Sequence, residues 1–385
     1  MSPCLERVNT VIVGGGPAGI ATAAGLVRRG LDPVVLEKGK TIAPAWRHHY
    51  DRLHLHTNKQ ISGLPGRPMP RHYPKYPSRD QVYSYLEGYA RDERVRIRLE
   101  TEVAHCRREG DLWILTTTEG AVYGAKHVVI ATGLSHVPVI PKYPKQEIYE
   151  GEILHSAEYR NGAAYATKHV LVVGFGNSAG EVALDLLDHG AHPHISVRSP
   201  SVVVPRDIAG VPILRLARWM SVFPPRFADW LSKPLLLATV GDVSIAGIPK
   251  AGWGPLAQIR KTGKIPMLDI GTMAALRSGS IKAQPGIERF TETGVIFSSG
   301  TSEPFDAIVF ATGFETGLER ILEDTTGLLD ETGRPLMSGR ATSRPGLYFC
   351  GFHEPPTGRL REIGLEAERI GDLIAGEVGL AVSRL

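Results

Sequence analysis

The sequence predicts an α/β fold built from two doubly wound modules, the second inserted into the first. Two observations lead to this prediction. A strand, a glycine-rich turn, a helix and a second strand occur at residues 9–37 and again at 169–198. In each half a later apolar strand ends in Ala-Thr-Gly, at 128–133 and at 306–313. Because both landmarks recur in the same order, each half of the chain is expected to form its own parallel sheet.

Length and composition fit this organisation. A chain of 385 residues with 42% hydrophobic content can bury a sizeable core and divide into about two or three domains. An apolar segment at 346–352 and a helical segment at 360–377 return the chain to the first module. We therefore assign 1–160 and 325–385 to the first domain and 161–324 to the second.

Charge and cysteine usage exclude several classes of protein. The net charge is only +4 and Lys and Arg are dispersed, which argues against a nucleic-acid partner. Cys4, Cys106 and Cys350 are scattered without CxxC spacing, so a disulfide framework, a zinc site and a dithiol redox centre are not expected. The N-terminus has no signal-like segment, which favours a cytoplasmic protein.

The longest apolar region, 211–240, is interrupted by Arg, Asp and Pro residues. It cannot supply the roughly 20 apolar residues that a membrane span needs. Whether this region covers a ligand or touches a membrane surface stays open.

The first glycine turn has the spacing of a dinucleotide-binding loop. Gly14 allows a tight turn, Gly16 lets a pyrophosphate approach the backbone, and Gly19 lets the helix pack closely on the strand. The phosphates would lie at the helix N-terminus, after Pro17 and Ala18. A second strand at 33–36 then ends at Glu37, where a carboxylate can accept hydrogen bonds from ribose hydroxyls. A chance glycine turn is the alternative.

The region 41–78 is rich in Pro, His, Tyr and Arg without clear periodicity, so we expect an irregular excursion over a ligand. Its histidines His48, His49, His54 and His56 invite a metal hypothesis. However, no cysteine or carboxylate cluster has matching spacing, and we predict no metal site. A helix at 78–94 follows, and short strands at 95–122 surround Trp113.

The second glycine turn repeats the first, with Gly174, Gly176 and then Ala179 in place of the third glycine. Its second strand ends at Arg198, which we take as the counterpart of Glu37. An arginine there can pair with a 2′-phosphate, and this favours NADPH over NADH. A solvated arginine at a strand end is the alternative.

These motifs together resemble the class B flavin-dependent monooxygenases of the flavin-containing monooxygenase type. The resemblance rests on the loop at 14–19, the Gly-x-Gly-Asn-Ser core at 174–178, and the segment Gly151-x-x-x-His155-x-x-x-Tyr159 between them. Tyr159 and the stretches at 50–56, 252–255 and 262–272 resemble the YUCCA branch of that family. Asn58, where plant members usually carry proline, and the ending at 353–362 resemble bacterial YUCCA-like proteins instead.

The resemblance implies FAD on the first loop, NADPH on the second, and a small-molecule substrate together with dioxygen. For the oxygen chemistry beside the flavin it implies His56, Asn58, Lys59 and Asn177. The expected cofactor contacts are Gly14, Gly16, Pro17, Ala18, Gly19, Glu37, Lys38, Trp46, Arg47, Thr132, Gly133, Gly174, Gly176, Asn177, Ser178, Ala179, Arg198, Thr312, Gly313 and Gly351. Ordinary loop hydrogen bonding is the alternative for the four reactive residues.

The reaction that the resemblance implies is the conversion of indole-3-pyruvate, NADPH and dioxygen to indole-3-acetate and carbon dioxide. N- or S-oxygenation, or a Baeyer–Villiger reaction, of another small molecule is the alternative. A flavin disulfide reductase and a non-catalytic dinucleotide sensor are further alternatives. The sequence leaves the oligomeric state open, with a homodimer as one option.

Overall fold

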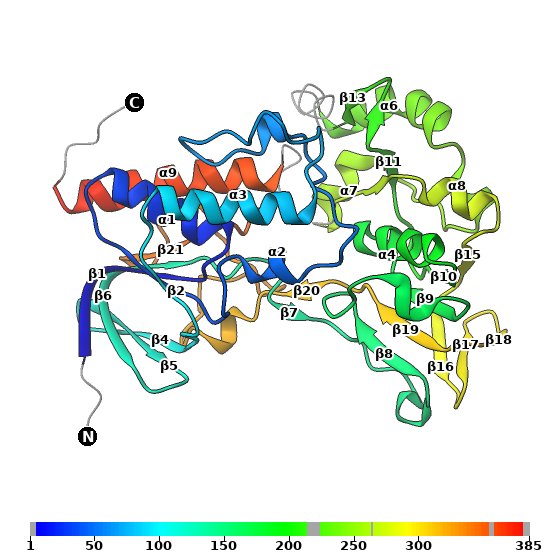
Figure 1. Cartoon of the computed structure of the whole chain (residues 1–385), viewed down its shortest axis with the longest axis horizontal. Helices are drawn as coiled ribbons and strands as arrows, with labels where there is room; N and C mark the ends of the chain where they lie inside the picture. Colours follow the sequence, from blue (N-terminus) through cyan, green and yellow to red (C-terminus); the bar gives the residue numbers. More distant parts are fainter. Residues whose placement is uncertain (1–4, 214–223, 263–264, 354–357, 380–385) are drawn as a thin grey trace. The chain divides into compact units, whose positions relative to one another are not determined.

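The computed structural model describes residues 5–213, 224–262, 265–353 and 358–379 (Figure 1). The chain folds into two compact units. Unit 1 contains residues 1–47, 57–137 and 314–385, and unit 2 contains 48–56 and 138–313. These boundaries differ from the predicted ones at 160/161 and 324/325, because the strand Glu152–His155 pairs within the sheet of unit 2. A short pair, β7 (Val137–Pro138) and β20 (Phe314–Glu315), lies where the chain passes between the units.

Unit 1 is organised on one mixed sheet. Its strands lie in the order β3-β2-β1-β6-β5-β4, and β21 also pairs with β6. The strands are β1 (Leu5–Val13), β2 (Val34–Leu36), β3 (Ile97–Arg98), β4 (Val103–Glu109), β5 (Leu112–Thr117), β6 (Val122–Ile130) and β21 (Leu347–Phe349).

Strand β6 has two partners on one side. Its first half pairs with β5 in antiparallel fashion, and its second half pairs with β21 in parallel fashion. The chain's last described strand therefore completes the sheet that its first strand began, as the sequence predicted. Apolar side chains of β1, β2, β6 and β21 form the core of this unit, and nearly all of them are fully buried.

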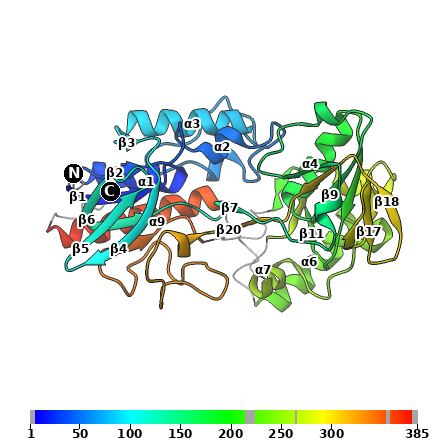
Figure 2. The same cartoon turned by 90° about the horizontal axis from the view of Figure 1, so that it is seen from below.

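Three long helices lie together on one face of the sheet of unit 1 (Figures 1 and 2). They are α1 (Pro17–Arg28), α3 (Arg79–Asp92) and α9 (Arg359–Glu377). Ser78 caps α3 through a reciprocal capping box with Gln81, which explains why this helix begins where the sequence predicted. The shorter elements are α2 (Pro44–His48), η1 (Lys59–Ile61) and η5 (Leu318–Arg320).

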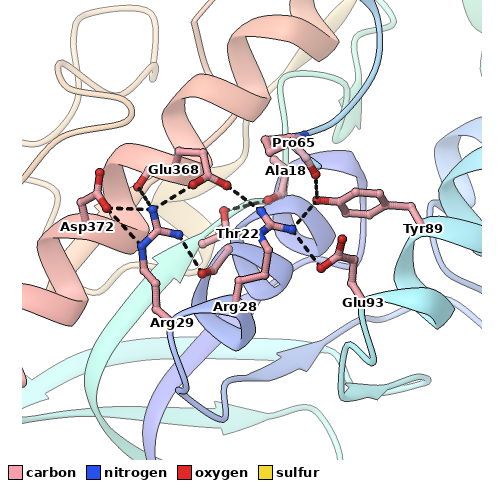
Figure 3. A network of polar contacts seen from close by, with 10 residues as sticks. Ala18, Thr22, Arg28, Arg29, Pro65, Tyr89, Glu93, Glu368 and Asp372 are labelled. Atoms are coloured by element: carbon pink, nitrogen blue, oxygen red, sulfur yellow. Dashed lines mark hydrogen bonds and ion pairs between the residues drawn. The ribbon is translucent and has the colours of Figure 1, made fainter. Parts of the chain in front are cut away.

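A polar network at the end of α1 joins these three helices (Figure 3). Arg28 pairs with Glu93 after α3 at 2.9 Å and with Glu368 on α9 at 2.6 Å. Arg29 bonds Glu368 at 2.8 Å and Asp372 at 2.7 Å. Because each guanidinium bridges separate elements, the network fixes how the helices lie on the sheet.

Unit 2 contains a five-stranded, fully parallel sheet in the order β15-β10-β9-β19-β8. A three-stranded antiparallel sheet, β16-β17-β18, precedes β19 in the chain. The strands are β8 (Glu152–His155), β9 (His169–Val173), β10 (His192–Ser196), β11 (Val203–Pro205), β12 (Asp207–Ile208), β13 (Val211–Pro212), β14 (Met267–Asp269), β15 (Lys282–Gln284), β16 (Ile287–Phe290), β17 (Gly294–Phe297), β18 (Ser302–Pro304) and β19 (Ala307–Phe310).

The parallel strands of the two units correspond one to one. In order across the sheet, β3, β2, β1, β6 and β21 match β15, β10, β9, β19 and β8. Both sheets therefore have the doubly wound arrangement, in which ligands bind at the carboxyl ends of the strands. The predicted fold class is confirmed.

The helices of unit 2 include α4, which follows the second glycine turn. They are η2 (Gln146–Ile148), η3 (Gly162–Tyr165), α4 (Asn177–Asp188), α6 (Pro225–Thr239), η4 (Val243–Ala246), α7 (Pro255–Thr262) and α8 (Thr272–Arg277). Part of the apolar region 211–240 lies outside the described residues. Among the helices that are described, none combines the length and the apolar content that crossing a bilayer requires.

Candidate functional site

The glycine turn of unit 1 meets the steric demands of a dinucleotide loop. Gly14 has φ +106°, and a Cβ there would lie 2.7 Å from the carbonyl oxygen of Ala131. A Cβ at Gly19 would lie 1.8 Å from the carbonyl oxygen of Gly14, so the helix can approach the strand only with glycine at this position. At Gly16 a Cβ would meet no described atom within 4 Å. The turn therefore has no room for a side chain at Gly14 and Gly19 but is open at Gly16, where a bound pyrophosphate approaches the backbone.

The N-terminus of α1 can receive an anion. Its N-cap is Gly16, Pro17 opens the helix, the first turn has no acidic residue, and no described side chain caps it. The backbone N–H groups and the positive end of the helix dipole are therefore available to phosphate. The hydroxyl of Thr132 is buried without a described hydrogen-bond partner, which leaves a donor beside the same edge of the sheet.

Glu37 lies beside this turn as predicted, and only 4% of it is exposed. One carboxylate oxygen accepts from the backbone N–H of Gly15 at 2.6 Å, and the other accepts from Gly39 at 2.7 Å. Each oxygen has a second lone pair, so the carboxylate can still accept a ribose hydroxyl. These contacts fit FAD in unit 1.

The remaining expected FAD contacts are spread over unit 1. Lys38 is exposed with its ammonium 3.3 Å from the His136 ring, and Arg47 lies over the Tyr83 ring at 5.0 Å. Trp46 lies on α2 and is partly exposed. Gly351 follows β21, and a Cβ there would lie 2.8 Å from the Cβ of Ala18 on α1. Gly351 is therefore adjacent to the loop, as expected.

The second glycine turn has the same geometry in unit 2. Gly174 has φ +118°, and a Cβ there would lie 2.6 Å from the carbonyl oxygen of Ala311, which precedes Thr312 and Gly313. A Cβ at Gly176 would meet no described atom within 4 Å. No described side chain caps α4, which leaves its first N–H groups, including that of Ser178, for a phosphate. Ala179 is fully buried in the helix. These features fit a second dinucleotide.

The backbone register corrects one sequence assignment. The N–H of Gly14 donates to Leu36, and that of Gly174 donates to Ser196, so these two strand residues are equivalent. Val197, which is buried, therefore matches Glu37, whereas Arg198 matches Lys38. The sequence assignment of Arg198 as the counterpart of Glu37 was therefore wrong by one residue. Arg198 is nevertheless exposed just after the strand, where an arginine can reach a 2′-phosphate.

The segment 151–159, which carries the resemblance, links parts of unit 2 to one another. His155 Nε2 donates to the carbonyl oxygen of Gly313 at 3.0 Å, while its Nδ1 accepts from Ala157 at 3.1 Å. Burial lowers the pKa of His155, which agrees with a neutral ring in this tautomer. Tyr159 donates to Asp185 on α4 at 2.7 Å, and burial beside that carboxylate raises the pKa of Tyr159. The segment thus fixes the edge of the sheet where the nucleotide loop lies.

The four residues expected to act in the oxygen chemistry belong to different units. His56 and Asn177 lie in unit 2, and Asn58 and Lys59 lie in unit 1. His56 Nε2 is 2.6 Å from a carboxylate oxygen of Glu181, one turn after Asn177 on α4. The carbonyl oxygen of the Asn177 side chain accepts from Leu268 at 2.7 Å, so its amide group remains a donor.

Asn58 and Lys59 have local partners in unit 1. Asn58 is buried and caps η1 by accepting from the N–H of Ile61 at 3.3 Å. The Lys59 ammonium donates to the carbonyl oxygens of Arg71 and Tyr73. The side chains of Asn58 and Lys59 therefore hydrogen-bond to backbone groups of their own loop. In the described ranges, no three His, Cys, Asp or Glu side chains converge as metal ligands.

Sequence reasoning missed the buried polar cluster on α4. Glu181 and Asp185 are both almost fully buried: Tyr50 and His56 of the segment 48–56 lie against Glu181, and Tyr159 donates to Asp185. The available signal was two acids at i and i+4 on an otherwise apolar helix, since buried carboxylates require partners. Nothing in the local sequence of residues 41–78 indicates that Tyr50 and His56 are the neighbours of Glu181.

Comparisons with known proteins agree with this geometry. Residues 11–207 match the family model for pyridine nucleotide-disulphide oxidoreductases. The chain is 39% identical to indole-3-pyruvate monooxygenase YUCCA4 of Oryza sativa subsp. japonica, over 89% of this chain and 82% of that protein. It is 36% identical to YUCCA1 of the same plant, over 91% of this chain and 89% of that protein.

Solved structures show the same fold at lower identity. A flavin-containing monooxygenase from Stenotrophomonas maltophilia aligns with TM-score 0.74 and 21% identity, over 97% of this chain and 100% of that one. Cyclohexanone monooxygenase from Rhodococcus sp. Phi1 bound to NADP+ aligns with TM-score 0.77 and 20% identity, over 98% and 85%. The chain belongs to the family of flavin-dependent monooxygenases that includes the YUCCA enzymes, and it is an FAD-containing, NADPH-dependent monooxygenase.

Proposed function

We propose that the protein catalyses the oxidative decarboxylation of an aromatic 2-oxo acid such as indole-3-pyruvate. The 2-oxo acid, NADPH, a proton and dioxygen would give the shortened carboxylate, carbon dioxide, NADP⁺ and water. One oxygen atom of dioxygen enters the carboxylate, and the other leaves as water. The bond broken in the substrate is the one between the carbonyl and carboxylate carbons.

A single observation carries this proposal. The relatives that match over most of this chain, at 34–39% identity, are named as indole-3-pyruvate monooxygenases or probable ones. The matches extend over 82–89% of the length of those proteins. The family match at residues 11–207 includes both nucleotide loops and the segment between them. The solved structures at 20–21% identity support the fold alone.

In this proposal unit 1 holds FAD and unit 2 holds NADPH. The flavin supplies the redox chemistry when bound, taking two electrons from NADPH and activating dioxygen. The N–H groups of α1 bind the pyrophosphate of FAD, and Glu37 accepts from its ribose. The N–H groups of α4 bind the pyrophosphate of NADPH, and Arg198 pairs with its 2′-phosphate.

We propose roles in the oxygen chemistry for His56 and Asn177 of unit 2 and for Asn58 and Lys59 of unit 1. His56 can accept or hold a proton, since its ring is partly exposed and one nitrogen is bound to a carboxylate. The amide of Asn177 can donate to a substrate or nucleotide carbonyl. Lys59 and Asn58 orient the loop through their backbone partners.

The cysteines argue against a disulfide reductase. The two that lie in the described part of the chain, Cys106 and Cys350, are free and buried. Burial raises the pKa of Cys106 to about 12 and raises that of Cys350 further, so neither thiol is activated for exchange. A non-catalytic sensor would bind nucleotides but would not consume NADPH.

The substrate class is tested by product analysis. Purified holoprotein is incubated with NADPH, air and, separately, indole-3-pyruvate, phenylpyruvate, a tertiary amine and a thioether. We expect carbon dioxide and the shortened acid from the 2-oxo acids only. An N-oxide or sulfoxide with an untouched 2-oxo acid would establish the heteroatom-oxygenating alternative, and the absence of NADPH oxidation with every compound would contradict enzymatic function.

A further inference from the structure

Glu181 is an unusual residue for its place in the fold. It lies one turn into α4, only 4% exposed, between the nucleotide loop and the apolar body of the helix. Glutamate is almost never this buried unless it is paired, because removing an unpaired carboxylate from water is costly. The partners of Glu181 therefore explain why it is there.

Both partners come from the segment 48–56. The Nε2 atom of His56 lies 2.6 Å from Oε1 of Glu181. The second neighbour is the Tyr50 side chain, itself 1% exposed, which lies close enough to Glu181 and Ser178 for electrostatic interaction. Burial raises the pKa of Tyr50, so the phenol keeps its proton and can donate it to the carboxylate. His56 therefore supplies the hydrogen bond to Oε1 of Glu181, whereas Oε2 is buried without a described hydrogen-bond partner.

The contact restricts the chemistry of the histidine ring. If Oε1 of Glu181 accepts the 2.6 Å hydrogen bond, Nε2 of His56 carries the proton. A neutral ring then presents Nδ1 as its one basic atom. The ring keeps 29% of its side-chain surface exposed, whereas the Glu181 side chain keeps 5%. The carboxylate is therefore the buried anchor, and the ring is the part that a reactant can reach.

We propose that Glu181 is a positioning residue that holds His56 in the Nε2–H tautomer and directs proton exchange to Nδ1. The Tyr50 side chain lies close to Glu181 and to Ser178, which follows the nucleotide loop. The same helix end that receives the nucleotide phosphate therefore also fixes the histidine. The catalytic use of Nδ1 depends on the proposed function, whereas the tautomer does not.

A neighbouring contact supplies a matched control. Arg52 of the same segment pairs with Asp188 on the same helix, in a more exposed position. Asp188→Asn and Glu181→Gln each remove one carboxylate that joins the segment 48–56 to α4. Only Glu181→Gln changes the partner of His56. Effects due to loosening of the segment appear in both variants, and effects due to the tautomer appear in one.

The direct test is ¹⁵N NMR of the holoprotein labelled at histidine, with His56 assigned by its absence in His56→Asn. At about pH 8.5, well above the ordinary histidine pKa of about 6.5, neutral tautomers are distinguished by their ring ¹⁵N shifts. We expect Nε2–H in the wild type and in Asp188→Asn, and a mixture in Glu181→Gln. An Nδ1–H ring in the wild type would overturn the proposal without any need for a Glu181 variant, and so would an unchanged ring in Glu181→Gln.

Turnover provides the second readout. In Glu181→Gln we expect kcat to fall on the order of tenfold or more, with KM for NADPH nearly unchanged and the pH profile altered. Asp188→Asn should keep the wild-type profile. A shifted tautomer in a protein that leaves 2-oxo acids untouched would sink the proposed function and leave the positioning role intact. Normal turnover of a 2-oxo acid by Glu181→Gln would support the proposed function and contradict the positioning role of Glu181.

Discussion

At the residue scale, we assign the preference for NADPH over NADH to the side chain of Arg198. Arg198 is exposed after β10, its Cγ packs near Gly286, and its charge acts on Tyr143. A charge-assisted pair with a phosphate contributes about 1.5–3 kcal/mol, which corresponds to roughly tenfold to hundredfold in binding. Replacing the arginine should therefore affect NADPH and spare NADH.

We predict that Arg198→Ala raises KM for NADPH by about tenfold to hundredfold and leaves KM for NADH nearly unchanged. Steady-state kinetics with both nucleotides measure this. Arg289→Ala, in the same unit but paired with Glu288 on the surface, serves as the control and should change neither value. An unaltered preference in Arg198→Ala would remove the arginine from the 2′-phosphate site.

Glu366 on α9 predicts a pH-dependent contribution to stability. It is 2% exposed, and Oε2 accepts from Gly351 at 2.6 Å and from Ser338 at 2.8 Å. Burial raises the pKa of Glu366 above its ordinary value of 4.5, so the folded state favours the protonated acid. The stability that this preference gives is present below pH 4.5 and is lost as pH rises through the folded-state pKa.

Urea unfolding of wild type and Glu366→Gln from about pH 4.5 to about pH 7.5 tests this sign. The free energy of unfolding of the wild type should fall relative to the variant across that range. Glu119→Gln, at an exposed acid of unit 1, should show no such trend. A constant difference between wild type and Glu366→Gln would mean that the carboxyl titrates as it does in the unfolded chain.

At the scale of elements, the two strand–turn–helix units could be predicted because glycine spacing reports local geometry. Gly14 and Gly174 need positive φ against a carbonyl oxygen, and no other residue type meets that demand cheaply. The irregular region 41–78 gave no such signal. Its contacts with α4 join residues more than 120 positions apart, as between His56 and Glu181, and only the folded chain reveals them.

In the loop of unit 1, we expect Gly16 to be needed for binding FAD and Gly19 to be needed for folding. Gly16→Ala should keep the free energy of unfolding of the apoprotein within about 1 kcal/mol, because a Cβ there meets open space, but it should lower bound FAD. Gly19→Ala should lower both, since its Cβ would overlap the carbonyl of Gly14. Flavin absorbance per chain and urea unfolding of the apoprotein measure the two quantities. Full FAD content in Gly16→Ala would show that the pyrophosphate binds elsewhere.

At the scale of the whole molecule, the chain alternates between two units whose sheets contain equivalent sets of parallel strands. The repeated landmarks made this insertion predictable, whereas the boundaries were not. Strand β8 belongs to unit 2 because it pairs with β19. The sequence of the proline-rich connector does not indicate that pairing. The segment 48–56 joins unit 2 through contacts such as the N–H of Asp51 with the carbonyl of Arg160. Such boundaries depend on long-range pairing, which local composition does not encode.

The central claim is that this molecule uses NADPH to place one atom of dioxygen into a 2-oxo acid. Incubation with ¹⁸O₂, NADPH and indole-3-pyruvate, with catalase present to remove free peroxide, measures it directly by mass spectrometry of the product. We predict indole-3-acetate carrying a single labelled oxygen, formed in step with NADPH consumed. NADPH oxidation that yields unlabelled acid, or no acid beyond that of a protein-free control, would contradict the claim.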